Sequence, residues 1–149
     1  MNFSGAGSTY LSIEDFNDTT RHNATLTATS LTGLSRGAIQ WVPSSTLMGG
    51  VVSLDISGSA AKSTYTVSDT PNLFYNTSLT LGDGSDSVFI TGTTGALDLY
   101  TGGGADTVVV GRLPPATVGN VAGIKGNLNI DGGGTVVLTV DDSGDTNGR

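Results

Sequence analysis

The chain has 149 residues, of which 23 are glycine and 13% are charged, and its formal net charge is −7. Its six Lys and Arg residues are scattered singly and form no basic stripe, which excludes nucleic acid as an expected partner. The chain has no cysteine, which excludes thiol chemistry and cysteine-based zinc sites, and no apolar run approaches the roughly 18 residues needed to span a membrane.

The first predicted element, residues 2–22, returns at the other end of the chain as residues 129–149. The two segments align without a gap at a distance of 127 positions, and 7 of the 21 aligned positions are identical. A chain whose last segment repeats its first is typical of a tandem array. We therefore interpret residues 1–149 as a single β-rich repeat unit, slightly more than one 127-residue period, from a larger chain.

The first third of the chain is less regular than the rest. Residues 10–16 and 23–29 have the composition of strands, and a third apolar stretch, residues 38–42, contains the single tryptophan. Trp41 is bulky for the interior of a narrow β-structure. We expect it to pack on the outside of a hydrophobic face or under a loop, the usual use of an aromatic side chain as buried apolar area.

Four later segments share the order strand, glycine-centred turn, strand, polar turn. They are residues 50–70, 76–92, 96–112 and 126–146. Strand pairs whose turns recur about 20 residues apart favour an all-β fold, a parallel β-solenoid (β-helix/β-roll-like) of about six rungs. An antiparallel β-sandwich is the alternative, because turn signals every 8–12 residues also fit that class.

Within this pattern, alternating residues are expected to face the interior, such as Val88 with Ile90 and Val108 with Val110. The spacing of the third and fourth turns is ten residues longer than that of the second and third. The extra residues fit a proline-containing loop over residues 113–125.

Two of the turns, residues 82–88 and 102–108, read G-x-G-x-D-x-V. This pattern resembles the hemolysin-type (RTX) calcium-binding repeat of secreted bacterial proteins. The resemblance covers about 30 residues and implies a β-roll in which turn carbonyls and Asp carboxylates hold Ca²⁺. It implies one calcium site, with Asp83, Asp86 and Asp106 as ligands. The alternative is that Gly and Asp simply form tight turns.

The acidic position changes in the other two turns. Val136 stands there in the fourth turn, and Ala61 or Lys62 in the first. The calcium prediction is therefore confined to the middle of the chain, and the terminal turns are expected to join neighbouring units.

A second acidic segment occurs in both copies of the terminal repeat, at residues 14–18 and 141–145. Alternating carboxylates on a turn could bind a hard cation, although such runs are commonly solvated turns. His22, the single histidine, aligns with Arg149. A residue that differs between two copies of one unit is expected at the surface.

The block Leu138–Thr146 and the stretch Leu31–Leu34 resemble repeats in very large bacterial surface or secreted proteins. The resemblance implies an extracellular or cell-surface location. It implies a structural role as stiff spacer, stalk or self-associating filament or adhesin segment, whose partners are neighbouring repeats or other copies of itself.

Two other functions are weighed against this one. A carbohydrate-binding module would place aromatic residues on one patch; the candidates are Tyr65, Phe74, Tyr75, Phe89 and Tyr100. A β-helix polysaccharide lyase would need a basic residue beside a metal site, and the candidates Lys62, Arg112 and Lys125 have no repeated acid next to them in sequence. We therefore expect no enzymatic activity and assign no catalytic residue.

Overall fold

A computed structural model describes residues 1–3 and 7–146 of the chain. The repeated glycine Gly5 and the residues 147–149, which include the counterpart of His22, lie outside the described part. The structure is all-β apart from one short 3-10 turn, η1 (Val121–Gly123). No helix within the described residues has the length and apolar character that crossing a membrane requires.

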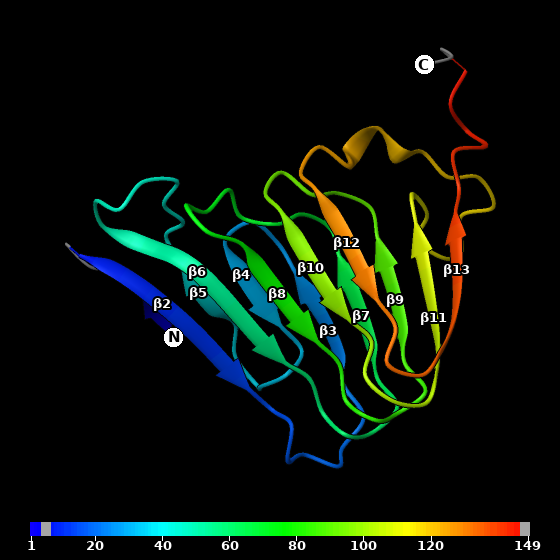
Figure 1. The fold of residues 1–149 in the computed structure, drawn as a ribbon, viewed down its shortest axis with the longest axis horizontal. Coiled ribbons are helices and arrows are strands. Elements are labelled where there is room, and N and C mark those ends of the chain that lie inside the picture. Colours follow the sequence, from blue (N-terminus) through cyan, green and yellow to red (C-terminus); the bar gives the residue numbers. More distant parts are fainter. Residues whose placement is uncertain (4–6, 147–149) are drawn as a thin grey trace.

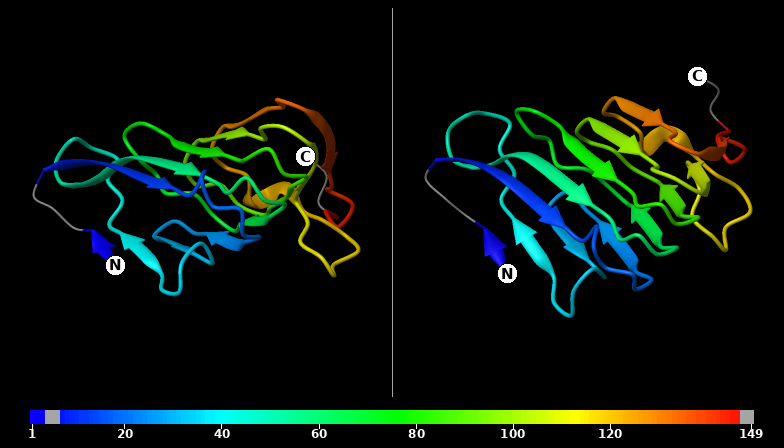
Figure 2. Two further views of the ribbon diagram at one scale, coloured as in Figure 1. Left: turned by 90° about the horizontal axis from the view of Figure 1, so that it is seen from below. Right: turned by 60° about the horizontal axis from the view of Figure 1, so that its bottom comes forward.

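The strands form two sheets that lie as separate layers, one of which is entirely parallel (Figure 1, Figure 2). This five-stranded sheet contains, in spatial order, β12 (Leu128–Asp131), β10 (Leu97–Tyr100), β8 (Thr77–Thr80), β6 (Gly50–Ser57) and β2 (Ser8–Glu14). Each strand pairs in parallel with its neighbour.

The second sheet is mixed and has eight strands. It contains, in spatial order, β1 (Asn2–Phe3), β5 (Ile39–Trp41), β4 (Ser30–Thr32), β3 (Asn23–Leu26), β7 (Thr64–Val67), β9 (Ser87–Ile90), β11 (Ala105–Val110) and β13 (Thr135–Val140). Only β4 runs antiparallel to its neighbours. The two sheets do not close into a barrel.

The chain alternates between the two sheets over most of its length. We call a strand of the five-stranded sheet and the next strand of the eight-stranded sheet a strand pair. The described residues form five of these, where the sequence predicted about six rungs: β2 with β3, β6 with β7, β8 with β9, β10 with β11, and β12 with β13. Consecutive strand pairs are stacked in register, so that Leu79 lies beside Leu99 in one sheet and Val88 beside Val108 in the other.

The core lies between the two sheets and is built from alternate residues of every strand pair. Val88, Ile90, Val108 and Val110 are 0–5% exposed, which confirms their predicted inward orientation. Their neighbours in sequence, such as Thr107 and Phe89, face outward. This alternation follows from the period of two along a β-strand, although Val109 of β11, between two core residues, is also buried.

The glycines of the turn before β11 are required by backbone conformation and by close stacking. Gly102 and Gly104 have positive φ angles of 69° and 91°. A Cβ atom at Gly102 would lie 2.3 Å from the carbonyl oxygen of Gly82 in the turn stacked on it. Only glycine combines this conformation with this approach. The predicted loop over residues 113–125 is present and contains η1.

The β4–β5 hairpin fills the N-terminal end of the core, and here one expectation is wrong. Trp41 is 3% exposed and belongs to the main hydrophobic cluster with Leu31 and Leu11. Its indole N–H donates to the carbonyl of Ala28 at 3.1 Å. The tryptophan fits inside because the hairpin inserts β4 and β5 between β3 and β1, which leaves space at this end that a simple strand pair would not.

A polar ladder and a candidate metal centre

Four residues at the starts of strands of the eight-stranded sheet form a ladder of hydrogen bonds from one strand pair to the next; three directly precede a strand and Asp106 is the second residue of β11. The backbone N–H of His22 donates to Ser63 Oγ at 3.0 Å, and the N–H of Ser63 donates to Asp86 Oδ1 at 2.6 Å. The N–H of Asp86 then donates to Asp106 Oδ1 at 2.9 Å. We call His22, Ser63, Asp86 and Asp106 the polar ladder.

The ladder corrects the alignment of the first of the four turns, in residues 50–70. The pairing of β7 with β9 brings Thr64 beside Ser87, so Ser63 occupies the acidic position rather than Ala61 or Lys62. A serine hydroxyl accepts a hydrogen bond as an Asp carboxylate does, and the ladder therefore continues through it. It ends at Val136, which lies beside Asp106 and has no polar side chain.

The two ladder carboxylates are buried, each about 1% exposed. Burial raises the pKa of Asp86 to about 6; the backbone hydrogen bond from Ser63 opposes this shift, and the nearby carboxylate of Asp106 adds to it. The second oxygen, Oδ2, of both Asp86 and Asp106 has no hydrogen-bond partner. Two buried carboxylates on adjacent strand pairs are costly when both are ionised, and a proton or a cation relieves that cost.

The three predicted calcium ligands are not gathered at one point. Asp83 is exposed at the turn, whereas Asp86 and Asp106 are inside. Each buried carboxylate already accepts a backbone N–H on Oδ1, a donor that competes with a cation for the same lone pairs. The Oδ2 atoms remain for an ion. Calcium at Asp83, Asp86 and Asp106 stays a prediction.

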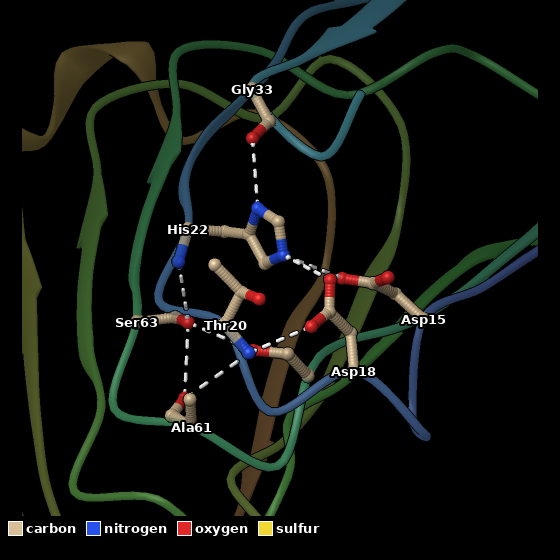
Figure 3. A network of polar contacts seen from close by, with 8 residues as sticks. Asp15, Asp18, Thr20, His22, Gly33, Ala61 and Ser63 are labelled. Atoms are coloured by element: carbon tan, nitrogen blue, oxygen red, sulfur yellow. Dashed lines mark hydrogen bonds and ion pairs between the residues drawn. The ribbon is translucent and has the colours of Figure 1, made fainter. Parts of the chain in front are cut away.

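The acidic segment of the N-terminal repeat contains a second arrangement, which sequence reasoning had only half recognised. Asp15, Asp18 and His22 each place one potential ligand atom within 4.8 Å of the other two (Figure 3). Within residues 1–3 and 7–146 no other group of three or more His, Cys, Asp or Glu residues is arranged in this way. His22 Nε2 lies 3.0 Å from Asp18 Oδ2 and 3.3 Å from Asp15 Oδ2. We call these residues the His22 cluster.

His22 is not the surface residue that its variation between copies suggested. Its side chain is only 13% exposed. The ladder holds its backbone against Ser63, and the turn that carries the two aspartates places them against its ring. That turn is closed by a hydrogen bond from the N–H of Asp18 to the carbonyl of Asp15, at 2.9 Å. The sequence signal was the spacing of the three residues within one short segment.

Hydrogen bonding determines the protonation of the His22 ring. Nδ1 faces the carbonyl oxygen of Gly33 at 3.2 Å, and a carbonyl only accepts, so Nδ1 carries a proton. Nε2 faces two carboxylates, which repel a lone pair. A proton between Nε2 and a carboxylate, or a bound cation, relieves that repulsion.

The pKa values in the cluster follow from these contacts. Burial of the ring opposes protonation, but hydrogen bonds to Asp18 and Gly33 and the charges of both aspartates outweigh it, so the pKa of His22 is raised. Hydrogen bonds from Thr20 and His22 lower the pKa of Asp18 to about 2. Burial raises the pKa of Asp15, although the charge of His22 opposes this shift.

A divalent cation with mixed nitrogen and oxygen ligands fits the His22 cluster better than calcium does. Tetrahedral Zn²⁺ with bonds of about 2.0–2.2 Å separates its ligand atoms by about 3.3–3.6 Å, close to the spacing seen here. The contact between Nδ1 and the Gly33 carbonyl is the support that metal-bound histidines commonly have. Two carboxylates and one imidazole could therefore hold such an ion.

The C-terminal copy of the same segment uses a different partner. Its turn is closed by the equivalent hydrogen bond, from the N–H of Asp145 to the carbonyl of Asp142, at 3.0 Å. Here Asp141 Oδ2 lies 2.9 Å from Arg112 Nε. Hydrogen bonds from Ser143 lower the pKa of Asp141, and Arg112 contributes to the same shift. This basic residue, one of the three candidates weighed for a lyase, is thus part of an ion pair.

The five aromatic candidates for a sugar platform do not share one face. Tyr65 is in the core, whereas Phe89 and Tyr100 lie on the outer faces of different sheets. Phe74 and Tyr75 do lie together, with ring centroids 4.9 Å apart, and Tyr75 lies 5.7 Å from the exposed ring of Tyr10. This cluster of three is the aromatic patch that the fold assembles.

Comparison with known proteins gives no further constraint on this site. A scan against protein-family models, a search of curated proteins and a search of solved structures each found no match to the chain.

Proposed function

We propose that the chain is a parallel β-solenoid segment that serves as a structural repeat, a stiff spacer or stalk, in a large extracellular bacterial protein. The observation that carries the proposal is the parallel stacking of five strand pairs, whose register shifts only between Thr9 and Tyr10 of β2 among the described pairings. In such a stack each strand pair is a rung that contacts only its neighbours. Stability then grows with the number of rungs, and length grows in proportion to sequence.

The polar ladder supports the same role. Asp86 and Asp106 direct one carboxylate oxygen each to a backbone N–H of the preceding rung. These bonds join one rung to the next and add to the backbone hydrogen bonds of the sheets. Buried polar groups that bond the backbone of the next rung hold the register of the stack and resist sliding of one rung against another.

The partners in this proposal are neighbouring repeats or other copies of the chain. The two edges of each sheet, β2 and β12 in one and β1 and β13 in the other, have one paired neighbour each. The unpaired side of each edge strand offers backbone N–H and C=O groups with which a further strand can pair. An extracellular surface location rests on the likeness of Leu138–Thr146 to repeats of bacterial surface proteins, and a bound cation would add stability to the stalk.

Chains of one, two and three units test this proposal, with residues 23–149 appended for each added unit. We expect the free energy of unfolding and the melting temperature to rise with each unit. Particle length in electron micrographs should grow by about 22 Å per unit, from about 4.8 Å for each of the four and a half rungs in a period. Units that melt independently, at one temperature whatever their number, would contradict a continuous stack.

The aromatic patch favours one second candidate, carbohydrate binding. Tyr10, Phe74 and Tyr75 are 66%, 47% and 47% exposed; the ring of Tyr75 is tilted against that of Tyr10 and meets that of Phe74 edge to face. Exposed aromatic rings of this kind suit the apolar face of a sugar ring. Titration of the chain with soluble polysaccharides, followed by tyrosine fluorescence, should show binding that Tyr75→Ala removes. Equal fluorescence changes in the natural chain and in Tyr75→Ala would rule out carbohydrate binding at the aromatic patch.

A further inference from the structure

We propose that successive 127-residue units of the array are related by a half-turn about the stacking axis. The five-stranded sheet of one unit then continues as the eight-stranded sheet of the next, and the reverse. The inference rests on the tandem array proposed above and adds to it the orientation of the units and the strands that meet at each junction.

The first observation is that the two copies of the terminal repeat lie in opposite sheets. β2, from the N-terminal copy, is the edge of the five-stranded sheet, and its counterpart β13 is the edge of the eight-stranded sheet. The shorter strands are exchanged in the same way, since β1 lies in the eight-stranded sheet and β12 in the five-stranded sheet. The two copies also lie at opposite ends of the long axis (Figure 1).

The exchange follows from the number of crossings. Between β2 and β13 the chain passes from one sheet to the other nine times, and the β4–β5 hairpin adds no crossing. Nine is odd, so a strand and its counterpart one period later always fall in different sheets. A chain that repeats with this period can keep its rungs continuous only if each unit is turned by half a revolution.

The second observation is that the copies agree in local structure. Leu11 and Ile13 lie on the side of β2 that faces the core, and their counterparts Leu138 and Val140 lie on the corresponding side of β13. The turn that follows is closed by the same hydrogen bond in both copies, 2.9 Å in one and 3.0 Å in the other. Because β2 and β13 turn matching side chains toward the core, they can pair with the same kind of neighbouring strand.

The third observation is the open C-terminal end of the core. A hollow of about 440 Å³ lies there, lined by Val110, Val121, Ile124, Leu128, Ile130, Leu138 and Val140. Leu138 is 51% exposed, whereas its counterpart Leu11 is 7% exposed. Leu11 belongs to one cluster with Trp41 and Leu31 of the β4–β5 hairpin. The hairpin of the next unit is the segment that would cover Leu138 in the same way.

The contacts of the N-terminal copy specify the junction residue by residue. β2 pairs with β6, so β13 should pair with β6 of the next unit. β1 pairs with β5, so β12 should pair with β5 of the next unit. In the first of these pairings Ser12 lies beside Asp55, and therefore Thr139, the counterpart of Ser12, should lie beside Asp55 of the next unit.

Cross-linking of a two-unit chain tests this, because the natural sequence has no cysteine. The chain consists of residues 1–149 followed by residues 23–149. One variant combines Thr139→Cys with Asp55→Cys of the second unit, and the other combines Asn129→Cys with the same cysteine. All three positions are exposed on outer sheet faces. Neighbouring strands lie about 4.8 Å apart, within reach of a disulfide or a short thiol cross-linker.

A half-turn predicts that the pair at Thr139 cross-links nearly completely and that the pair at Asn129 does not. The single-unit variant Ser12→Cys with Asp55→Cys is the matched positive control, since these two residues are neighbours within one unit. Cross-linking at Asn129 instead of Thr139 would overturn the half-turn and leave the array standing, because β6 would then extend the five-stranded sheet. Cross-linking of neither pair, with the control intact, would overturn both the half-turn and the continuous array.

Discussion

The two ends of this molecule are built from the same sequence block and yet differ in how their cores are covered. At the N-terminal end the β4–β5 hairpin closes the core with Trp41 and Leu31, and Leu11 is buried. At the C-terminal end nothing in the described chain does the same for Leu138 and Val140, which are 51% and 63% exposed.

The comparison separates local structure from burial. Both copies form a strand, present the same alternate residues inward and close the same Asp turn. Their burial differs because it depends on neighbouring strands that the repeated block does not encode. A leucine in a correct strand with a correct orientation is therefore stabilising only where a further element packs on it.

Removal of the tryptophan that closes the N-terminal end should have the largest effect. Trp41→Ala leaves a large cavity and an unpaired Ala28 carbonyl, and we expect a loss of about 3–5 kcal/mol of unfolding free energy in urea denaturation. Val42→Ala, at a residue 52% exposed next to it, is the control and should cost under about 1 kcal/mol. Equal costs would mean that Trp41 does not close the core.

The matched leucines test the comparison most directly. Leu11→Ala should cost about 2–4 kcal/mol in the single chain, and Leu138→Ala under about 1 kcal/mol, because only the first is buried. In the two-unit chain the cost at Leu138 should rise toward that at Leu11. A cost at Leu138 that stays unchanged there would show that the next unit leaves the open end uncovered.

The polar ladder begins in the closed end and stops at Val136 in the open end, and its middle should respond to pH. The pKa of Asp86 is raised to about 6 in the folded chain, so the folded state binds the proton more tightly than the unfolded state does. This stabilising contribution is complete below about pH 4 and is lost as the pH rises through about 6. The loss should be on the order of 1–3 kcal/mol.

Asp86→Asn tests the origin of that loss, because the amide oxygen keeps an acceptor for the Ser63 N–H without the charge. The variant should lack the fall in stability between pH 4 and 6 and exceed the natural chain in stability at pH 7. Calcium should stabilise the natural chain and not this variant if the ion binds at Asp86 and Asp106. Thermal melts in calcium and in chelator measure both effects.

Among residues 1–3 and 7–146 the His22 cluster is found at the N-terminal end alone, and it should give the smallest of these effects. The pKa of His22 is raised, so the stability it contributes is complete below the ordinary histidine pKa and is lost as the pH rises through the higher, folded value. We expect a fall of about 2–4 °C in melting temperature over that range, absent in His22→Gln.

Zinc should reverse the sign of the pH dependence of the melting temperature. The ion must displace the proton on Nε2, and it therefore binds better as the pH rises. Zinc at ten times its dissociation constant would add about 1.4 kcal/mol. A rise of melting temperature with zinc that persists in His22→Gln would place the ion elsewhere.

The sequence predicted local features well and their environment poorly. Glycine-centred turns and alternating apolar residues identified the strand pairs from residue 50 onward, because such patterns depend on near neighbours in the chain. The position of Trp41 was missed because it depends on an inserted hairpin. The ladder role of Ser63 was missed because the register of β7 against β9 is set by tertiary pairing. His22 was misjudged for the same reason, since its partners come together only when the turn folds back.

The sequence by itself determined that the chain is all-β, which alternate side chains face inward, and that its first segment returns 127 residues later. Only the tertiary structure decided that the returning segment lies in the opposite sheet, because sheet membership depends on the number of crossings in between. It also decided that one copy is buried and the other open. Burial is a property of the neighbours a strand acquires, and the sequence of a strand specifies its own conformation far more directly than the identity of those neighbours.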